Sequence, residues 1–265
     1  MNRARRRPPA IVLVAAVVTV AFFALPLIAL LQRAAWSDLW SHLSSDAGRE
    51  ALRLSLLTSV GAALLSVVFG TPLAWVLART EVPGRAVIRS LVLLPMVLPP
   101  VVGGVALLSA FSLSSPIGGW MHRVAGIQLT FTAWGTVLAA TFVAMPFFVL
   151  AAEGAFRGMD ERYEHAAASL GADRFTTFRR ITVPMVAPSL VAGAVLAWAR
   201  ALGEFGATIT FAGNIEGRTR TLPLAIYLAL EGSATRPVAV SLSIVLLTTS
   251  LVVLVALRDR WWSTT

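Results

Sequence analysis

Long apolar runs separated by short polar, arginine-bearing segments dominate the pattern of this chain. Six runs are long enough to cross a bilayer as helices, since a span needs about 20 mainly apolar residues. They cover about 10–31, 52–78, 87–112, 131–152, 184–211 and 238–257. The pattern predicts an all-α membrane protein with about six transmembrane helices, built as a single domain over residues 1–265.

Pro and Gly residues interrupt several runs, most densely in the segment 93–104, LLPMVLPPVVGG. Such breaks are tolerated in membranes where neighbouring helices or a cavity satisfy the freed backbone groups. This segment is compatible with a kinked helix in a tight bundle and with a bend that lines a translocation path. The apolar stretch 222–230 is too short to span, and we interpret it as a re-entrant or interfacial piece.

The composition agrees with a membrane location. Hydrophobic residues make up 57% of the chain and charged residues 13%, against roughly 25% charged residues in soluble domains. The net charge of +9 would suggest nucleic acid in a soluble protein, but the arginines here lie at the ends of spans. We therefore expect lipid around the chain and no nucleic-acid partner. With no Cys and three His in separate loops, no metal site is expected either.

The arginines also predict how the chain is oriented. The run from Ala10 to Leu31 is longer than the roughly 7–15 residues of a signal-peptide core, so we expect it to be retained as the first span. With the N-terminus in the cytoplasm, 14 arginines lie inside and seven outside, and Arg200 lies within a span. Basic residues favour the cytoplasmic side, so both termini and the polar loop 153–183 are predicted to be cytoplasmic.

The loop 153–183 is predicted to form a pair of short helices. Asp160 can cap the first helix, and Gly171 can end it in a left-handed conformation. Asp173 can cap a second helix, and Pro184 can then open the fifth span.

Three apolar residues of the second helix, Phe175, Phe178 and Ile181, recur every three positions and so share roughly one face. Arginines surround this face. Buried aromatic anchors with a charged rim are typical of a docking interface. An amphipathic connector lying on the bilayer surface would have the same pattern. The pattern alone leaves both interpretations open.

The segment 165–184, HAAASLGADRFTTFRRITVP, resembles the EAA loop of ABC-importer permeases, written E-A-A-x3-G-x9-I-x-L-P. In that family the loop docks on a cytoplasmic ATPase. The resemblance implies that one set of residues couples this chain to an ATPase: His165, Ala166, Ala167, Gly171, Phe175, Phe178, Ile181 and Pro184. One position departs from the family pattern, because His165 stands where the family has Glu, while Glu164 comes one residue early.

A second segment, 201–227, resembles the molybdate/tungstate permeases of the same importer type. Its GEFGATI element, 203–209, is shared in general form with sulfate permeases, whereas the continuation 214–227 is more similar to the molybdate branch. The resemblance implies a type I ABC-importer permease for molybdate or tungstate in a bacterial-type plasma membrane. It further implies a homodimer, two copies of an ATPase subunit, and an extracytoplasmic solute-binding protein.

No catalytic site and no directly bound cofactor are expected. The sequence lacks a G-x4-GK[ST] phosphate loop, so ATP and magnesium are expected on the partner ATPase. Eight residues follow Leu257, so no C-terminal regulatory domain is expected.

Three other functions fit the sequence less well. A sulfate or thiosulfate importer is the nearest alternative. An ion-coupled secondary transporter usually contains internal repeats, which are not evident, and it leaves the cytoplasmic loop without a role. An intramembrane enzyme would need a base within a span, where no His lies.

The substrate path is expected to bind a dianion weakly, because conduction needs release. Hydroxyl, amide and backbone N–H groups suit this, and the candidates are Gly203, Gly206, Thr208, Thr210 and Asn214. The alternative is that the glycines allow close helix packing and the hydroxyls bond back to their own helix.

Arg200 and Glu204 are four residues apart on one helix face and are expected to pair. Charges inside a membrane usually face the protein interior or water. The pair can fix the structure or act as a gate, and the sequence leaves both roles open.

Overall fold

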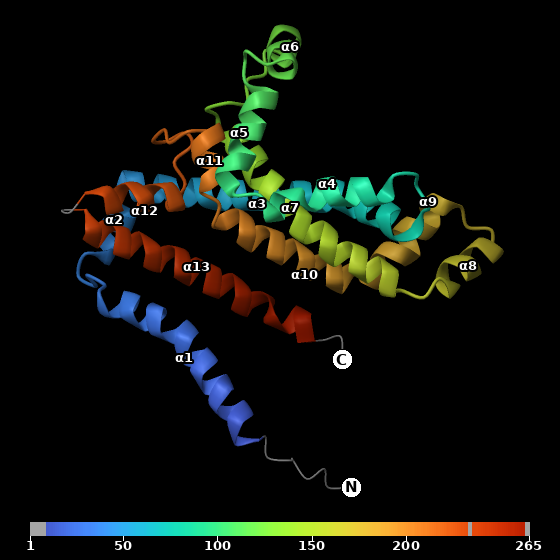
Figure 1. Ribbon diagram of the computed structural model, residues 1–265, viewed down its shortest axis with the longest axis horizontal. Coiled ribbons are helices and arrows are strands. Elements are labelled where there is room, and N and C mark those ends of the chain that lie inside the picture. Colours follow the sequence, from blue (N-terminus) through green and yellow to red (C-terminus); the bar gives the residue numbers. More distant parts are fainter. Residues whose placement is uncertain (1–8, 233–234, 263–265) are drawn as a thin grey trace.

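The computed structural model describes residues 9–232 and 235–262, and all regular elements assigned there are helical (Figure 1). These elements are α1 (Ala10–Gln32), α2 (Leu39–Ser44), α3 (Asp46–Arg79), α4 (Arg85–Val97), α5 (Pro100–Phe111), α6 (Pro116–Ala125), α7 (Ala133–Gly158), α8 (Arg162–Ser169), α9 (Arg174–Thr177), the π-helical turn η1 (Phe178–Thr182), α10 (Val183–Leu202), α11 (Gly206–Phe211), α12 (Leu222–Glu231) and α13 (Arg236–Trp262). The N-terminal arginines Arg3, Arg5, Arg6 and Arg7, on which the predicted orientation partly rests, lie outside the described residues.

Five helices are long and apolar enough to cross a membrane: α1, α3, α7, α10 together with the turns before it, and α13. A sixth crossing is obtained if α5 and α6, which are bent by 53° at their junction, count as one broken span. The α1 helix contains no buried residue, and Ile11 is 78% exposed. A helix that is apolar on all sides needs lipid or protein around it, so the fold is that of a multi-pass membrane protein.

The helices α3, α7 and α10 pack together at the centre of the molecule, where small residues let their backbones approach (Figure 1). Phe148 of α7 is fully buried between Gly70 of α3 and Gly193 of α10. A Cβ atom at Gly70 would lie 2.6 Å from Phe148 Cδ1, and one at Gly193 would lie 3.3 Å from Phe148 Cδ2. Small residues at the contacts are the usual way for membrane helices to gain packing energy.

Two of the expected spans are interrupted. The run 87–112 is divided between α4 and α5, because Leu98 is extended before Pro99 and Pro100 follows at the start of α5. Proline supplies no N–H and disfavours helix at the residue before it. The run 184–211 is divided between α10 and α11 at residues 203–205. The segment 93–104 therefore contains a full break rather than a kink in a continuous helix, and its place on a translocation path stays a prediction.

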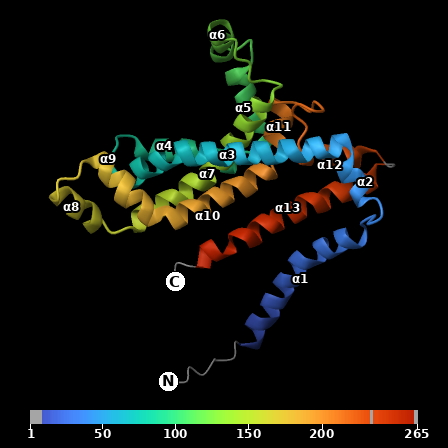
Figure 2. The same cartoon turned by 180° about the vertical axis from the view of Figure 1, so that it is seen from behind.

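The broken helices meet beside the bundle. In Figure 1 and in the reverse view of Figure 2, α5 rises away from α3 and α7, with α11 beside it and α6 at its tip. Glycines make the contact close: a Cβ atom at Gly104 of α5 would lie 2.7 Å from Thr210 Cβ, and one at Gly206 of α11 would lie 2.9 Å from Pro100 Cβ. The short helix α12, over the stretch interpreted as re-entrant or interfacial, packs on α13 and α3.

This contact predicts different effects for two Gly→Ala substitutions. Gly206→Ala should destabilise the protein by about 1–3 kcal/mol, because the methyl group overpacks the α5–α11 contact. Gly154→Ala in α7 has no atom within 4 Å of its new Cβ, so it should be neutral or stabilising, by up to about 1 kcal/mol through helix propensity. Thermal unfolding in detergent measures both variants, and equal unfolding temperatures would contradict the packing role of Gly206.

Candidate functional site

The helices α8 and α9 form the predicted pair in the loop 153–183. Asp160 lies just before α8, and its Oδ1 accepts a hydrogen bond of 2.9 Å from the backbone N–H of Arg162. This bond holds the pKa of the Asp160 carboxyl below its usual value. The N-cap position itself is Glu161, one residue later than expected. Gly171, with φ of +84°, ends the helix in the left-handed conformation as predicted.

The second helix is capped as expected. Asp173 Oδ1 accepts a hydrogen bond of 2.6 Å from Thr176 N–H, which lowers the pKa of the Asp173 carboxyl. The chain then passes through the π-helical turn η1 directly into α10. Pro184, in the first turn of α10, has no N–H to give to the carbonyl of Arg180, and a wider turn accommodates that loss. The second coupling helix is therefore continuous with a membrane span.

The three apolar residues of this helix do not share one exposed face. Phe175 is 69% exposed. Phe178 instead packs against the helix bundle, and its ring centroid lies 5.4 Å from that of Trp75 near the end of α3. Ile181 is half-buried. The prediction of a common docking face is therefore wrong for Phe178, because the turn η1 and the Trp75 ring place it against the bundle.

Other exposed apolar side chains accompany Phe175. Leu170, just before Gly171, is 89% exposed, and Tyr163 on α8 is 49% exposed. Apolar side chains that gather outside a membrane make a candidate interaction site. We name Tyr163, Leu170 and Phe175 the exposed coupling residues. The sequence analysis missed Tyr163 and Leu170, although an isolated Leu in a polar loop could have indicated them.

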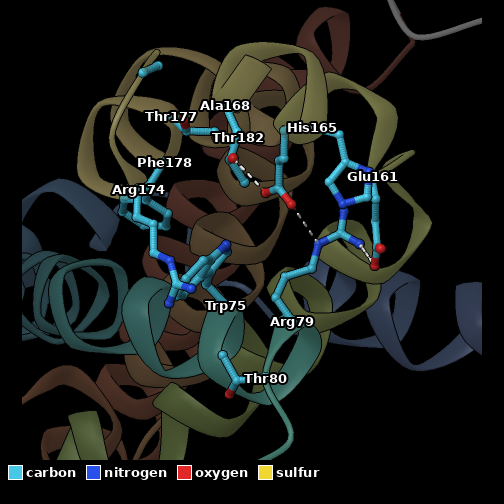
Figure 3. A pocket seen from close by; sticks show the side chains of 12 residues that line it. Trp75, Arg79, Thr80, Glu161, His165, Ala168, Arg174, Thr177, Phe178 and Thr182 are labelled. Carbon is cyan, nitrogen blue, oxygen red and sulfur yellow. Dashed lines mark hydrogen bonds and ion pairs between the residues drawn. The ribbon is translucent and has the colours of Figure 1, made fainter. Parts of the chain in front are cut away.

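Glu164, rather than His165, makes the internal contacts of α8. Its Oε1 accepts a hydrogen bond of 2.7 Å from the Thr182 hydroxyl, and its Oε2 lies 3.7 Å from Arg79 Nε. His165 and Ala166 are exposed, while Ala167 is 5% exposed and packs inward. His165 lines a pocket of about 310 Å³ between α8, α9 and the end of α3 (Figure 3).

Arg200 and Glu204 form the expected pair. Arg200 Nη1 lies 2.7 Å from Glu204 Oε2, and the Glu204 side chain is 2% exposed. Its other oxygen accepts a hydrogen bond of 2.8 Å from the backbone N–H of Ala207. Glu204 therefore caps α11 at the break, where the helix dipole also favours an anion.

The candidate path residues fall into separate environments. Gly206 is buried against α5, Thr208 is 1% exposed, and the Thr210 hydroxyl donates back to the carbonyl of Gly206 at 2.9 Å. Asn214 Oδ1 accepts from Arg220 Nε at 2.9 Å, and Gly203 is exposed. The geometry therefore supports packing roles for Gly206 and Thr210. Among the candidate path residues, Gly203, three residues after Arg200, is the one that is exposed.

A buried carboxylate at the other end of the bundle escaped the sequence analysis. Glu153 of α7 is 2% exposed, and it pairs with Arg157 one turn later and with Arg89 of α4, at 3.2 Å from Nε. A charged residue at the end of an apolar run is a candidate for a special role. Here the contacts fasten α4 to α7 just before the coupling helices.

Residues 66–263 match the family of binding-protein-dependent transport system inner membrane components. The chain belongs to this family. It is 45% identical over 245 residues to the molybdenum transport system permease protein ModB of Mycobacterium tuberculosis, which covers 92% of each chain. It is 44% identical over 187 residues to ModB of Escherichia coli K12, covering 71% of this chain and 82% of that protein. The sulfate transport system permease protein CysT of the same E. coli strain is 35% identical over 237 residues, covering 88% of this chain and 85% of that protein.

Solved structures confirm the type I ABC-importer permease fold. A bacterial ABC transporter that imports alginate matches with a TM-score of 0.75 and 19% identity, covering 97% of this chain and 95% of the other. The MetNI methionine transporter in an inward-facing conformation matches with a TM-score of 0.58 and 16% identity, covering 83% and 99%. Together, the family and the curated relatives identify the chain as a multi-pass permease component of an ABC importer in the plasma membrane.

The buried ion pair predicts a specific pattern of stability. Arg200→Met should destabilise the protein by about 3–5 kcal/mol, because it leaves the Glu204 charge buried without its partner. Adding Glu204→Gln should recover much of this loss, since a Gln oxygen can still accept from Ala207 N–H.

Thermal unfolding in detergent measures both variants. The control is Arg49→Met, whose pair with Asp46 is exposed at both side chains (66% and 96%), so its effect should stay within about 0.5 kcal/mol. Equal losses in the single and double variants would contradict a role for the pair.

Proposed function

We propose that this chain is the permease subunit of an ATP-driven importer for molybdate or tungstate. The observation that carries the proposal is the 45% identity to molybdenum permeases over 92% of both chains. The 44% identity to an archaeal relative from Haloferax volcanii, named a probable molybdenum ABC transporter permease, points the same way. The sulfate permeases are less similar, at 35% identity, so sulfate uptake is the second candidate.

The importer would contain further subunits. An ATPase is needed because this sequence has no phosphate-binding loop of its own. Two ATPase copies would serve a homodimer of this permease and would hold the ATP and magnesium. A solute-binding protein on the outer side would deliver the oxyanion; an alginate transporter with this fold is known in complex with a periplasmic protein that holds its substrate.

The exposed coupling residues are the proposed ATPase contact. They belong to a loop rich in arginine, and the apolar groups can anchor the ATPase while the charges around them orient it. In this arrangement the loop is cytoplasmic, and both termini lie on the same side. In Figure 1, the N-terminal end of α1 and the C-terminal end of α13 point toward the side where α8 and α9 lie, which supports this orientation.

The proposed mechanism is alternating access. Closure of the ATPase dimer would displace α8 and α9, and α9 would move α10 with it because η1 joins them without a break. The far end of α10 carries Arg200, Gly203 and the capped start of α11. We propose that this junction acts as a gate for the oxyanion. The exposed Gly203 follows the cation Arg200 by three residues, so an anion can approach there. The negative charge of the buried Glu204 opposes tight binding of a second anion.

The docking proposal predicts different effects for the exposed residues Leu170 and Phe175 and for the inward-facing Phe178. Leu170→Ala and Phe175→Ala should each weaken binding of the ATPase by about tenfold or more, as truncation of interface anchors does, without changing thermal unfolding. Phe178→Ala should instead lower the unfolding temperature, because it removes the ring that packs on Trp75.

Co-purification of the ATPase and thermal unfolding in detergent separate the two effects. The control is Leu57→Ala on α3, a residue 57% exposed within a span, which should change neither quantity strongly. Normal ATPase binding by both Leu170→Ala and Phe175→Ala would exclude this surface as the contact.

The substrate is tested by uptake of labelled molybdate into vesicles that contain this chain with its ATPase and binding protein. We expect uptake that requires ATP and resists excess sulfate, because the relatives favour the molybdate branch. Uptake abolished by an equal concentration of sulfate would support the sulfate alternative. Uptake without ATP would contradict an ABC importer.

A further inference from the structure

The end of α3 contacts α8, the residue that follows α7, and the turn η1. Arg79 is the final residue of α3, and its side chain is only 7% exposed. Its Nη1 donates to Glu161 Oε1 at the start of α8, and its Nη2 donates to the carbonyl of Met159 after α7, both at 2.7 Å. Its Nε lies 3.7 Å from Glu164 Oε2. One guanidinium group thus joins α3 to the end of α7 and to α8.

Glu164 extends these contacts to α10. Its second oxygen accepts the hydrogen bond from Thr182, which is fully buried at the end of η1. Since η1 continues into α10, the chain of contacts Arg79–Glu164–Thr182 connects two membrane spans through α8. Figure 3 shows Arg79 reaching from α3 toward Glu161, with Thr182 on the opposite wall of the same pocket.

Trp75 adds an apolar contact from the same face of α3. It lies four residues before Arg79, and residues at this spacing are neighbours on a helix surface. Its ring packs edge-on against Phe178, at 5.4 Å between centroids. Phe178 begins η1, which leads into α10. The helix α3 therefore contacts α8 through the ionic groups of Arg79 and contacts the start of the α10 span through the aromatic pair.

An arginine is well suited to this position. Its planar group presents several N–H donors in a fixed geometry, which lets it hydrogen-bond one carboxylate and a carbonyl while it lies within ionic distance of a second carboxylate. The end of a helix also favours a cation, and the carbonyl of Met159 follows the end of α7. A lysine has the same charge but offers a single point of attachment.

We propose that Arg79 is a positioning residue that makes α3, α8 and α10 move as one body when the ATPase displaces the coupling helices. This inference deepens the proposed function and rests on it, because the movement is driven by a docked ATPase. The exposed coupling residues bind the ATPase, whereas Arg79 faces inward and transmits the displacement. Loss of Arg79 should therefore separate ATP hydrolysis from transport without preventing docking.

The first test uses Arg79→Met in the complete complex with the ATPase and binding protein. We expect the ATPase to co-purify normally and to hydrolyse ATP, while labelled molybdate transported per ATP falls by about tenfold, within the range of coupling between distant sites. Arg79→Lys should recover part of the ratio. The matched control is Arg49→Met outside this loop, since Arg49 is 66% exposed and likewise pairs with an aspartate, Asp46; its ratio should not change.

A second measurement reports the movement itself. The chain has no Cys, so spin labels can be attached at Leu64→Cys on α3 and Ser169→Cys on α8, both exposed. Pulsed electron paramagnetic resonance then gives the distance between the labels. With Arg79 present, a non-hydrolysable ATP analogue should leave this distance unchanged. With Arg79→Met or Arg79→Lys, the analogue should alter it, because α8 moves without α3.

The outcomes distinguish this inference from the function it rests on. If the unaltered complex does not transport molybdate, the proposed function fails. If it does, and Arg79→Met transports with the normal ratio and an unchanged label distance, the role of Arg79 is refuted. If Arg79→Met does not reach the membrane, the variants Arg79→Lys and Thr182→Val provide the test. A normal amount of molybdate transported per ATP in both variants refutes the Arg79–Glu164–Thr182 linkage. A reduced amount with intact ATPase binding supports it.

Discussion

Backbone N–H and C=O groups inside a bilayer find no water, so any interrupted helix must be satisfied by the protein itself. The rest of this structure depends on how that constraint is met at two breaks. At the α4–α5 break, Pro99 and Pro100 have no N–H to satisfy. At the α10–α11 break, the Glu204 carboxylate supplies an acceptor, and Arg200 neutralises its charge. Glycines then bring α5 and α11 together tightly enough to exclude solvent from the contact.

The opposite end of the bundle meets a different requirement under the proposed mechanism, in which it transmits the displacement of a docked ATPase to the spans. A flexible loop would absorb the motion of a docked partner. Here α9, η1 and α10 form a continuous helix, and α8 is held to it through Glu164 and Thr182. The loop is therefore a rigid extension of the spans. Its exposed apolar groups point outward, while Glu164 is used internally to fasten the helices.

The sequence predicted the helical membrane fold, the coupling pair and the family because these depend on local patterns. Runs of apolar residues define spans, Asp173 and Gly171 define helix ends, and the Arg200–Glu204 spacing defines a pair. The sequence did not predict that Phe178 faces inward, because this depends on a π-helical turn and on Trp75, about 100 residues earlier in the chain. The roles of Arg79 and Glu153 also depend on partners that are distant in sequence. The identity of the gate residues stays a prediction.

Helix polarity explains how the buried charges are partnered. Arg79 at the end of α3 and Glu204 at the start of α11 each have the sign that the helix dipole favours. Glu153 opposes this rule, because an anion near the end of α7 faces the negative end of the dipole. It is also the buried carboxylate that is paired with two arginines, Arg89 and Arg157. The second cation offsets the unfavourable position of the carboxylate. Both arginine side chains are nearly half exposed, so water also solvates the two cations, whereas the Glu153 carboxylate is buried and depends on them.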